Sequence, residues 1–139
     1  MGKGKDREVP RDSNPVNPDE ARSEDQAMTT MLLVAMSLIA GEVEEVERLA
    51  GKYDAKTEVR QWDGTRIDML TKTEAIEVDY APKWAEAIGQ SLYYAEVSGK
   101  SPAIVLLVRD MRKDAKYVYR CQTVCAKWRI KLYTERVGP

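Results

Sequence analysis

A run of six consecutive apolar residues, Ala103–Val108, constrains the fold of this 139-residue chain more than any other feature. Unbroken runs of branched apolar residues are typical of strands that are buried on both faces and paired in parallel with a neighbour. A parallel strand needs a crossover connection, which is usually a helix. The stretch Lys83–Val97, preceded by Pro82 and followed by Gly99, has the length and flanking residues of such a helix. The chain is therefore predicted to be an α/β protein.

Three short strands are predicted before this helix. Thr57–Gln61, Arg66–Leu70 and Glu74–Tyr80 have strand-like patterns, and turn-forming or polar residues separate them, which indicates an antiparallel meander. After the apolar run, residues 113–127 have helical periodicity, and Arg129–Thr134 alternates as an edge strand does. The predicted sheet is therefore mixed, with helices flanking it.

The first 41 residues are expected to lie outside this arrangement. Residues 1–26 are polar and of mixed charge, so they cannot bury enough apolar surface to offset the entropy of ordering, and a flexible tail is predicted. Ala27–Ala40 is the strongest apolar run, but a stable membrane span needs about 20 residues. The run is expected to form a helix that ends at Gly41, or else the core of a signal peptide cleaved near Ala40.

The absence of histidine limits the chemistry that the chain can perform. His-based zinc sites, Ser-His-Asp triads and Cys-His pairs are excluded, and two cysteines are too few for an all-cysteine zinc site. Cys121 and Cys125 are four residues apart in a predicted helix, which favours neighbouring reduced thiols over a disulfide. Acid–base or metal chemistry must therefore come from carboxylates, lysines or tyrosines.

Charge is distributed unevenly although the net charge is -1. Residues 98–139 hold 10 Lys+Arg and 3 Asp+Glu, whereas residues 1–97 hold the other 12 basic and 20 acidic residues. A basic C-terminal part beside an acidic centre fits a phosphate track that leads to a cation site, and it equally fits an ordinary solvated surface. On the first interpretation, basic groups from Lys100 onward neutralise a nucleic-acid backbone.

Three acidic residues lie on two neighbouring predicted strands. Asp68 takes the strand face opposite to its two apolar neighbours, and Glu77 and Asp79 are two residues apart and so share one face. Carboxylates held this close repel one another unless a cation sits among them, and oxygen ligands suit Mg²⁺ or Mn²⁺. We therefore expect Asp68 and Glu77 to bind the metal, with the carbonyl of Val78 as an additional ligand.

The helix after these strands carries a polar stripe at steps of 3, 4 and 4 residues, namely Lys83, Glu86, Gln90 and Tyr94. A stripe that begins just after an acidic strand can overhang the end of that strand and contact a metal-bound water or a phosphate. A separate apolar stripe is expected to pack on the sheet and consists of Trp84, Ile88, Leu92 and Ala95.

These features resemble the motif series of the PD-(D/E)XK nuclease superfamily, especially its RecB-like branch. That branch has a Gly-x-x-Asp element, an acidic-x-Lys strand and a Gln-x-x-x-Tyr helix, to which Gly64–Asp68, Glu77-x-Asp79 and Gln90-x-x-x-Tyr94 are similar. Glu77–Ala81 followed by Lys83–Gln90 also looks like the hallmark of a family of small, largely uncharacterised bacterial and phage proteins. The resemblance implies a restriction-endonuclease-like αβββαβ core and a Mg²⁺-dependent (or Mn²⁺-dependent) DNA endonuclease or exonuclease.

The superfamily usually has a lysine two residues after the motif acid, where this chain has Asp79. The resemblance leaves three interpretations. Lys83 supplies the ammonium that orients the attacking water, with Lys72 as a second candidate. Alternatively, Asp79 is an additional metal ligand or a base, or the site is inactive.

The resemblance also implies roles for residues on the flanking helices. Gln90 and Tyr94 complete the catalytic pocket, and Glu47, on the amphipathic helix predicted at Glu42–Lys52, is the candidate helical motif acid. Residues 27–41 are the apolar or signal-like segment, and residues 42–139 form the nuclease-like domain.

DNA is the implied partner, a homodimer would allow both strands to be cut, and residues 1–40 are a candidate contact for another protein. No stable membrane span is expected. The expected location is the cytoplasm, that of the host if a phage encodes the chain, or the outside of the cell if Ala27–Ala40 is a signal peptide. The alternative function is a catalytically inactive module of the same fold that binds DNA or packs in a phage or protein assembly.

Overall fold

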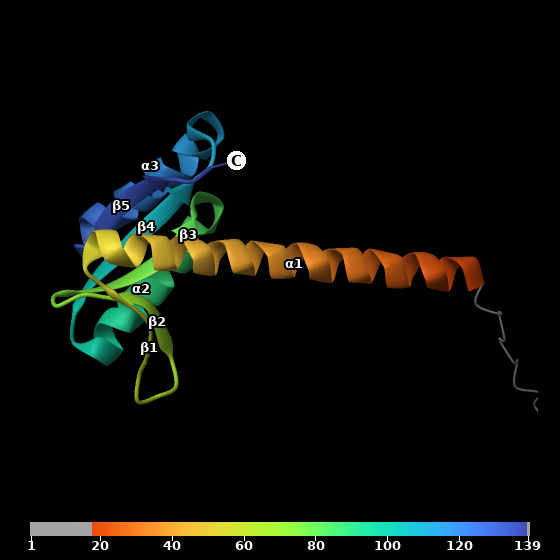
Figure 1. Cartoon of the computed structure of the whole chain (residues 1–139). Helices are drawn as coiled ribbons and strands as arrows, with labels where there is room; N and C mark the ends of the chain where they lie inside the picture. Colours follow the sequence, from red (N-terminus) through yellow and green to blue (C-terminus); the bar gives the residue numbers. More distant parts are fainter. Residues whose placement is uncertain (1–17, 139) are drawn as a thin grey trace, which may run out of the picture. The chain divides into compact units, whose positions relative to one another are not determined.

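The fold is known from a computed structural model, which describes residues 18–138 (Figure 1). The elements in chain order are α1 (Pro18–Tyr53), β1 (Lys56–Arg60), β2 (Arg66–Leu70), β3 (Glu74–Tyr80), the short 3-10 helix η1 (Ala81–Lys83), α2 (Trp84–Ser98), β4 (Ser101–Val108), α3 (Met111–Trp128) and β5 (Lys131–Arg136). The chain divides into two units between Ser37 and Leu38, and the second unit holds all the strands.

The strands form one mixed sheet in the order β1-β2-β3-β4-β5. β1, β2 and β3 are antiparallel neighbours, while β3, β4 and β5 run parallel, with α2 and α3 as the crossovers. The α/β class, the meander, the parallel placement of the apolar run and the final edge strand are thereby confirmed.

Strand β4 explains why the apolar run is unbroken, because both of its faces are covered. Ala103, Val105 and Leu107 pack with α1 residues of the second unit, in a cluster that includes Val46 and Leu49. The intervening residues of β4 face the other way, toward α2 and α3, and this second cluster contains Ala87, Ile104, Leu106, Cys121, Cys125 and Ile130. The second unit is therefore a helix–sheet–helix sandwich.

The two cysteines belong to the second cluster as free thiols. Their Sγ atoms are 3.7 Å apart on α3, so the prediction of neighbouring reduced thiols is confirmed. They contribute packing volume between α3 and the sheet.

Helix α1 differs from the sequence prediction at both ends of the apolar run. Residues 18–26 are helical, so the predicted tail is wrong there, and residues 1–17 lie outside the described part of the chain. Gly41 does not end a helix, because α1 continues through it to Tyr53. A single glycine inside a helix costs about 1 kcal/mol relative to alanine, which the strong helix formers on either side offset. The predicted helix end at Gly41 is therefore wrong.

Helix α2 packs on the sheet through only part of the predicted stripe. Trp84 and Ile88 pack against the second cluster as expected. Leu92 is 38% exposed, whereas Ala87, Ser91 and Tyr94 are buried. The helix is therefore rotated so that the end of the predicted polar stripe turns inward, where it meets β3.

Candidate functional site

The centre of the candidate site is a fork between β2 and β3. The two strands pair as far as Met69 and Ile76, and the same register carried one step on would place Asp68 opposite Glu77. The backbone N–H of Val78 donates to Asp68 Oδ2 at 2.9 Å, a bond that a carbonyl of β2 would accept in a continuing ladder. The carboxylate thus replaces a ladder partner, and it lies directly beside that of Glu77.

Glu77 is almost completely buried, at 3% exposure. With its amide nitrogen turned toward Glu77, the side chain of Gln90 donates to both carboxylate oxygens of Glu77, at 3.0 Å to Oε2. The buried hydroxyl of Tyr94 interacts with the same carboxylate. The two strand acids and the two inner residues of the α2 stripe therefore meet as the sequence indicated.

The electrostatics of the Asp68–Glu77 pair are unfavourable. Burial raises the pKa of both carboxyl groups, and the proximity of Asp68 raises the pKa of Glu77 further. The N–H of Val78 offsets only part of the cost at Asp68. Such a pair binds either a proton or a cation in preference to remaining doubly charged.

Asp79 and Lys83 form a second pair of charged groups. Asp79 follows Glu77 by two residues on β3, and Lys83 is the last residue of η1. Asp79 is 2% exposed, Lys83 Nζ is 3.4 Å from its Oδ1, and the N–H of Tyr80 donates to the same oxygen at 2.8 Å. Burial raises the pKa of Asp79 to about 6, against the opposing effect of the Lys83 ammonium. Asp79, which stands where the superfamily usually has its lysine, thus pairs with the ammonium of Lys83 from η1.

Glu47, the acid assigned to the first helix by sequence, is exposed, and the acid that α1 turns toward the site is Glu42. Burial raises the pKa of Glu42, Lys83 lowers it, and the charge of Asp68 raises it again. The assignment of Glu47 is therefore corrected. The buried face of α1 contains Val46, four residues after Glu42, whereas Val43, four residues before Glu47, is 44% exposed.

Glu58 is a further residue that the sequence did not single out. It lies opposite Asp68, between the paired positions Thr57–Met69 and Val59–Ile67 of β1 and β2. Its φ of 51° is a left-handed conformation, which is rare within a strand. No sequence pattern signals such a position, because it depends on how β1 pairs with β2.

A cavity of about 350 Å³ opens beside Asp68. Three carboxylates line it, those of Glu42, Glu58 and Asp68, and the guanidinium of Arg66 pairs with Glu58 at 3.4 Å. Solvent and small ions can therefore reach the carboxylate of Asp68, which lies beside that of the buried Glu77.

The donor set fits a magnesium ion that retains water. Within residues 18–138, no three His, Cys, Asp or Glu side chains are placed to hold a metal ion by themselves. Mg²⁺ in phosphoryl-transfer sites is commonly bound through one or two carboxylates, several waters and the substrate phosphates. Asp68 and Glu77, with the carbonyl of Val78 between the two acids of β3, provide such a partial set without any soft ligand.

Basic side chains gather at the carboxyl ends of the parallel strands, beside the second pair. The Arg109 guanidinium lies 4.0 Å from the centre of the Tyr80 ring. The two residues line a cavity of about 290 Å³ together with Pro82, Leu107, Asp110, Lys113 and Asp114. Arg112 and Arg136 line an adjoining cavity. We call Arg109, Arg112, Lys113 and Arg136 the near basic surface.

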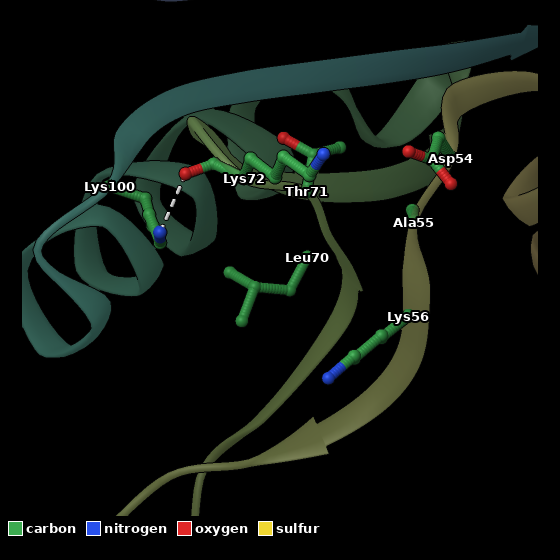
Figure 2. Close-up of a pocket in the computed structure, with 7 residues that line it drawn as sticks. All are labelled: Asp54, Ala55, Lys56, Leu70, Thr71, Lys72 and Lys100. Atoms are coloured by element: carbon green, nitrogen blue, oxygen red, sulfur yellow. Dashed lines mark hydrogen bonds between the residues drawn. The ribbon is translucent and has the colours of Figure 1, made fainter.

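A second group of lysines lies at the opposite end of the sheet. Lys56, Lys72 and Lys100 line a pocket of about 460 Å³. We call these three lysines, which are labelled in Figure 2, the far basic surface. The ammonium of Lys100 donates to the backbone carbonyl of Lys72 at 2.6 Å. Lys72 precedes the start of β3, whereas Asp79 lies near its end, so the structure does not bring Lys72 to the carboxylates.

Comparisons with known proteins give one relative and no family. No family model matches the chain, and no solved structure matches it. A KilA-N domain-containing protein of Acanthamoeba polyphaga mimivirus is 33% identical over 91 residues, which cover 66% of this chain and 35% of the relative. The chain thus spans about a third of the length of that relative.

Proposed function

We propose that the second unit hydrolyses DNA phosphodiester bonds in a reaction that depends on Mg²⁺ or Mn²⁺. The observation that carries the proposal is that the carboxylates of Asp68 and of the buried Glu77 lie beside the Asp79–Lys83 pair at the β2–β3 fork. The element order αβββαβ and the resemblance to PD-(D/E)XK nucleases support a restriction-endonuclease-like assignment.

Asp68, Glu77 and the Val78 carbonyl would hold the metal ion, which would lower the pKa of a bound water and stabilise charge on the phosphate. Gln90 fixes the carboxylate of Glu77 by donating to it, and Tyr94 encloses it from the side of α2. These two residues keep the ligand in one orientation and exclude solvent from it.

Lys83 would orient the attacking water. The carboxylate of Asp79 is already engaged, because it pairs with the ammonium of Lys83 and accepts a hydrogen bond from the N–H of Tyr80. It positions the ammonium that the usual superfamily lysine would otherwise supply. Glu42 adds a further negative charge that favours the protonated state of Lys83.

DNA is proposed as the substrate because the near basic surface places Arg109 on the ring of Tyr80, the residue after Asp79, while the net charge of -1 gives no general attraction to nucleic acid. The mimivirus relative supports this substrate, since a KilA-N domain is a DNA-binding type of domain. Its viral source is also consistent with an origin of this chain in a virus or phage.

The test is cleavage of plasmid and of end-labelled linear and single-stranded DNA by the full chain, with Mg²⁺, Mn²⁺ or EDTA. We expect cleavage with either metal, none in EDTA, and a loss of 100-fold or more in Asp68→Asn, about the effect of removing one electrostatic group from an active site. Glu47→Gln, which removes the same charge from an exposed position, is the control. Equal cleavage by wild type and Asp68→Asn would exclude this site as the source of the activity.

A second candidate is a catalytically inactive DNA-binding module of the same fold. The observation that favours it is Asp79, which stands where the superfamily has its lysine. Under this proposal, EDTA-treated protein binds a labelled duplex as tightly as metal-treated protein, and neither sample shortens it. Metal-dependent shortening of the duplex that Asp68→Asn abolishes would exclude the inactive module.

A further inference from the structure

The most exposed apolar surface of the described chain lies in α1, in the residues that precede Glu42. Gln26–Gly41 contains no charged residue over 16 positions and is bounded by Asp25 and Glu42. All eight of its large apolar side chains are at least 45% exposed, and Met31 is the most exposed at 74%. Within the described residues, Gln26–Tyr53 has the length and composition to cross a membrane, and the mean hydropathy of its most apolar stretch is 1.4, with none of that stretch buried.

The distribution of these side chains around the helix indicates what covers them. At roughly 100° per residue, the large apolar side chains span an arc of about 260°. The remaining arc holds small or polar residues, namely Gln26, Thr30, Ser37 and Gly41. A helix that packs on one partner helix or on a globular surface needs an apolar stripe only slightly more than 100° wide. An environment that is apolar on nearly every side is the hydrocarbon of a lipid bilayer.

The polar groups of this segment are compatible with that environment. An α-helix satisfies its backbone groups internally, which a segment in hydrocarbon requires. The hydroxyl of Thr30 donates to the carbonyl of Gln26 at 2.9 Å, so it too is bonded within the helix. At 1.5 Å per residue, Gln26–Gly41 is about 24 Å long, a few ångströms shorter than a hydrocarbon core of about 30 Å. Local thinning of the bilayer accommodates a difference of this size.

We propose that Gln26–Gly41 inserts into a lipid bilayer and anchors the chain to a membrane. The proposal replaces the expectation of no stable membrane span, which rested on the length of the apolar run alone. Its test is separate from that of the proposed nuclease activity, because Ile39 lines the cavity beside Asp68 but no charged side chain of the site lies between Gln26 and Gly41.

The experiment is flotation of the full chain with vesicles of pure phosphatidylcholine, which carry no net charge and therefore bind no protein through basic residues. Val34→Asp and Met36→Asp place a charge on nearly opposite sides of the helix. Gly51→Asp places the same charge on α1 outside the segment, at an exposed position with open space around its Cα. Circular dichroism establishes that each variant is folded.

We expect the wild type and Gly51→Asp to float with the vesicles, and both Val34→Asp and Met36→Asp to lose at least 10-fold in the bound-to-free ratio. Failure of the wild type to float would overturn the proposal. So would release by only one of the two variants, because a protein partner or second copy that covers one stripe tolerates a charge on the other side. Formation of a stable dimer without vesicles, abolished by only one of the two, would equally assign the segment to a protein interface.

Discussion

At the residue scale, the chemistry of the site depends on which charged group reaches which carboxylate. Strand parity and helical spacing predicted that Asp68, Glu77, Asp79, Lys83, Gln90 and Tyr94 would gather, and the structure brings them together. The same reasoning selected Glu47 in place of Glu42. In a strand, side chains alternate between two faces, so residues two apart share a face whatever the strand packs against. In a helix, the face that a residue occupies can be assigned only relative to residues known to be buried. Whether these residues bind a metal or hydrolyse DNA stays a prediction.

Lys83 should matter far more than Lys72 for catalysis. Lys83→Ala removes the ammonium held 3.4 Å from Asp79 and should lower the DNA cleavage rate about 100-fold, the lower range for a positioned proton-transfer group. Lys72→Ala, at the other end of β3, should change the rate less than twofold. Initial rates on labelled linear DNA at saturating Mn²⁺ measure both. Equal effects of the two substitutions would contradict the assignment.

Glu42 and Glu47 provide a matched pair on one helix. Glu42→Gln removes a charge that interacts with both Lys83 and Asp68. The cleavage rate, or the Mn²⁺ concentration that gives half of the maximal rate, should therefore change about 10-fold or more. Glu47→Gln removes the same charge from an exposed position and should have no measurable effect. A reversed order in a metal titration of the cleavage rate would restore Glu47 as the motif acid.

At the element scale, the strands were predictable and the extent of α1 was not. The bounds of β2 and β3 agree with the sequence prediction, because turn-forming residues separate stretches in which apolar and polar residues alternate. Gly41 suggested a helix end, but nothing at that position requires a left-handed backbone, and the helix continues to Tyr53. Two other glycines, Gly64 and Gly99, do have positive φ and do mark turns.

The end of α1 is fixed to the edge strand β5 through Glu135. Tyr53 donates to its Oε1 at 2.7 Å and Lys52 Nζ lies 2.5 Å from the same oxygen. Burial acts to raise the pKa of Glu135, but these two partners outweigh it and hold the pKa below its ordinary value. A carboxylate with a lowered folded pKa adds stability at pH values above its unfolded pKa, and that stability is lost as the pH falls through the folded pKa.

Glu135→Gln should therefore lower the free energy of unfolding by about 1 kcal/mol at pH 7, the usual contribution of a partly exposed hydrogen-bonded charge. The difference between wild type and variant should shrink below about pH 4.5, where the carboxyl group of the unfolded chain becomes protonated. Urea denaturation at pH 7 and pH 3.5 measures both values. A difference that stays constant with pH would show that the ionised form contributes nothing.

At the scale of the whole molecule, the sequence predicted a basic C-terminal part but not its division. Lys100 belongs to the far basic surface and Arg109 to the near one, because β4 carries the chain from one end of the sheet to the other. Of the two surfaces, the near one contacts Tyr80, the residue that follows Asp79 on β3. The sequence gives the number of basic residues after residue 98, but their positions in space depend on the path of β4 through the sheet. The separation of the near from the far basic surface is therefore seen only in the fold.

The near basic surface should carry the DNA contact. Arg109→Ala with Arg136→Ala should weaken binding to a random-sequence duplex and reduce the slope of log K against log salt by about 2, because each lost phosphate contact removes roughly one released counterion. Lys56→Ala with Lys100→Ala, on the far basic surface of Figure 2, removes equal charge and should leave the slope nearly unchanged. Fluorescence anisotropy over a salt series measures the slopes, and a larger effect of the far pair would contradict the assignment.

The measurement that tests the central claim most directly is calorimetric titration of Mn²⁺ into the full chain, compared with Asp68→Asn, Glu77→Gln and Glu47→Gln. The account predicts a saturable site in the wild type and in Glu47→Gln, and its loss in both Asp68→Asn and Glu77→Gln. Binding that survives in Asp68→Asn and Glu77→Gln, or no binding by the wild type at millimolar Mn²⁺, would contradict it.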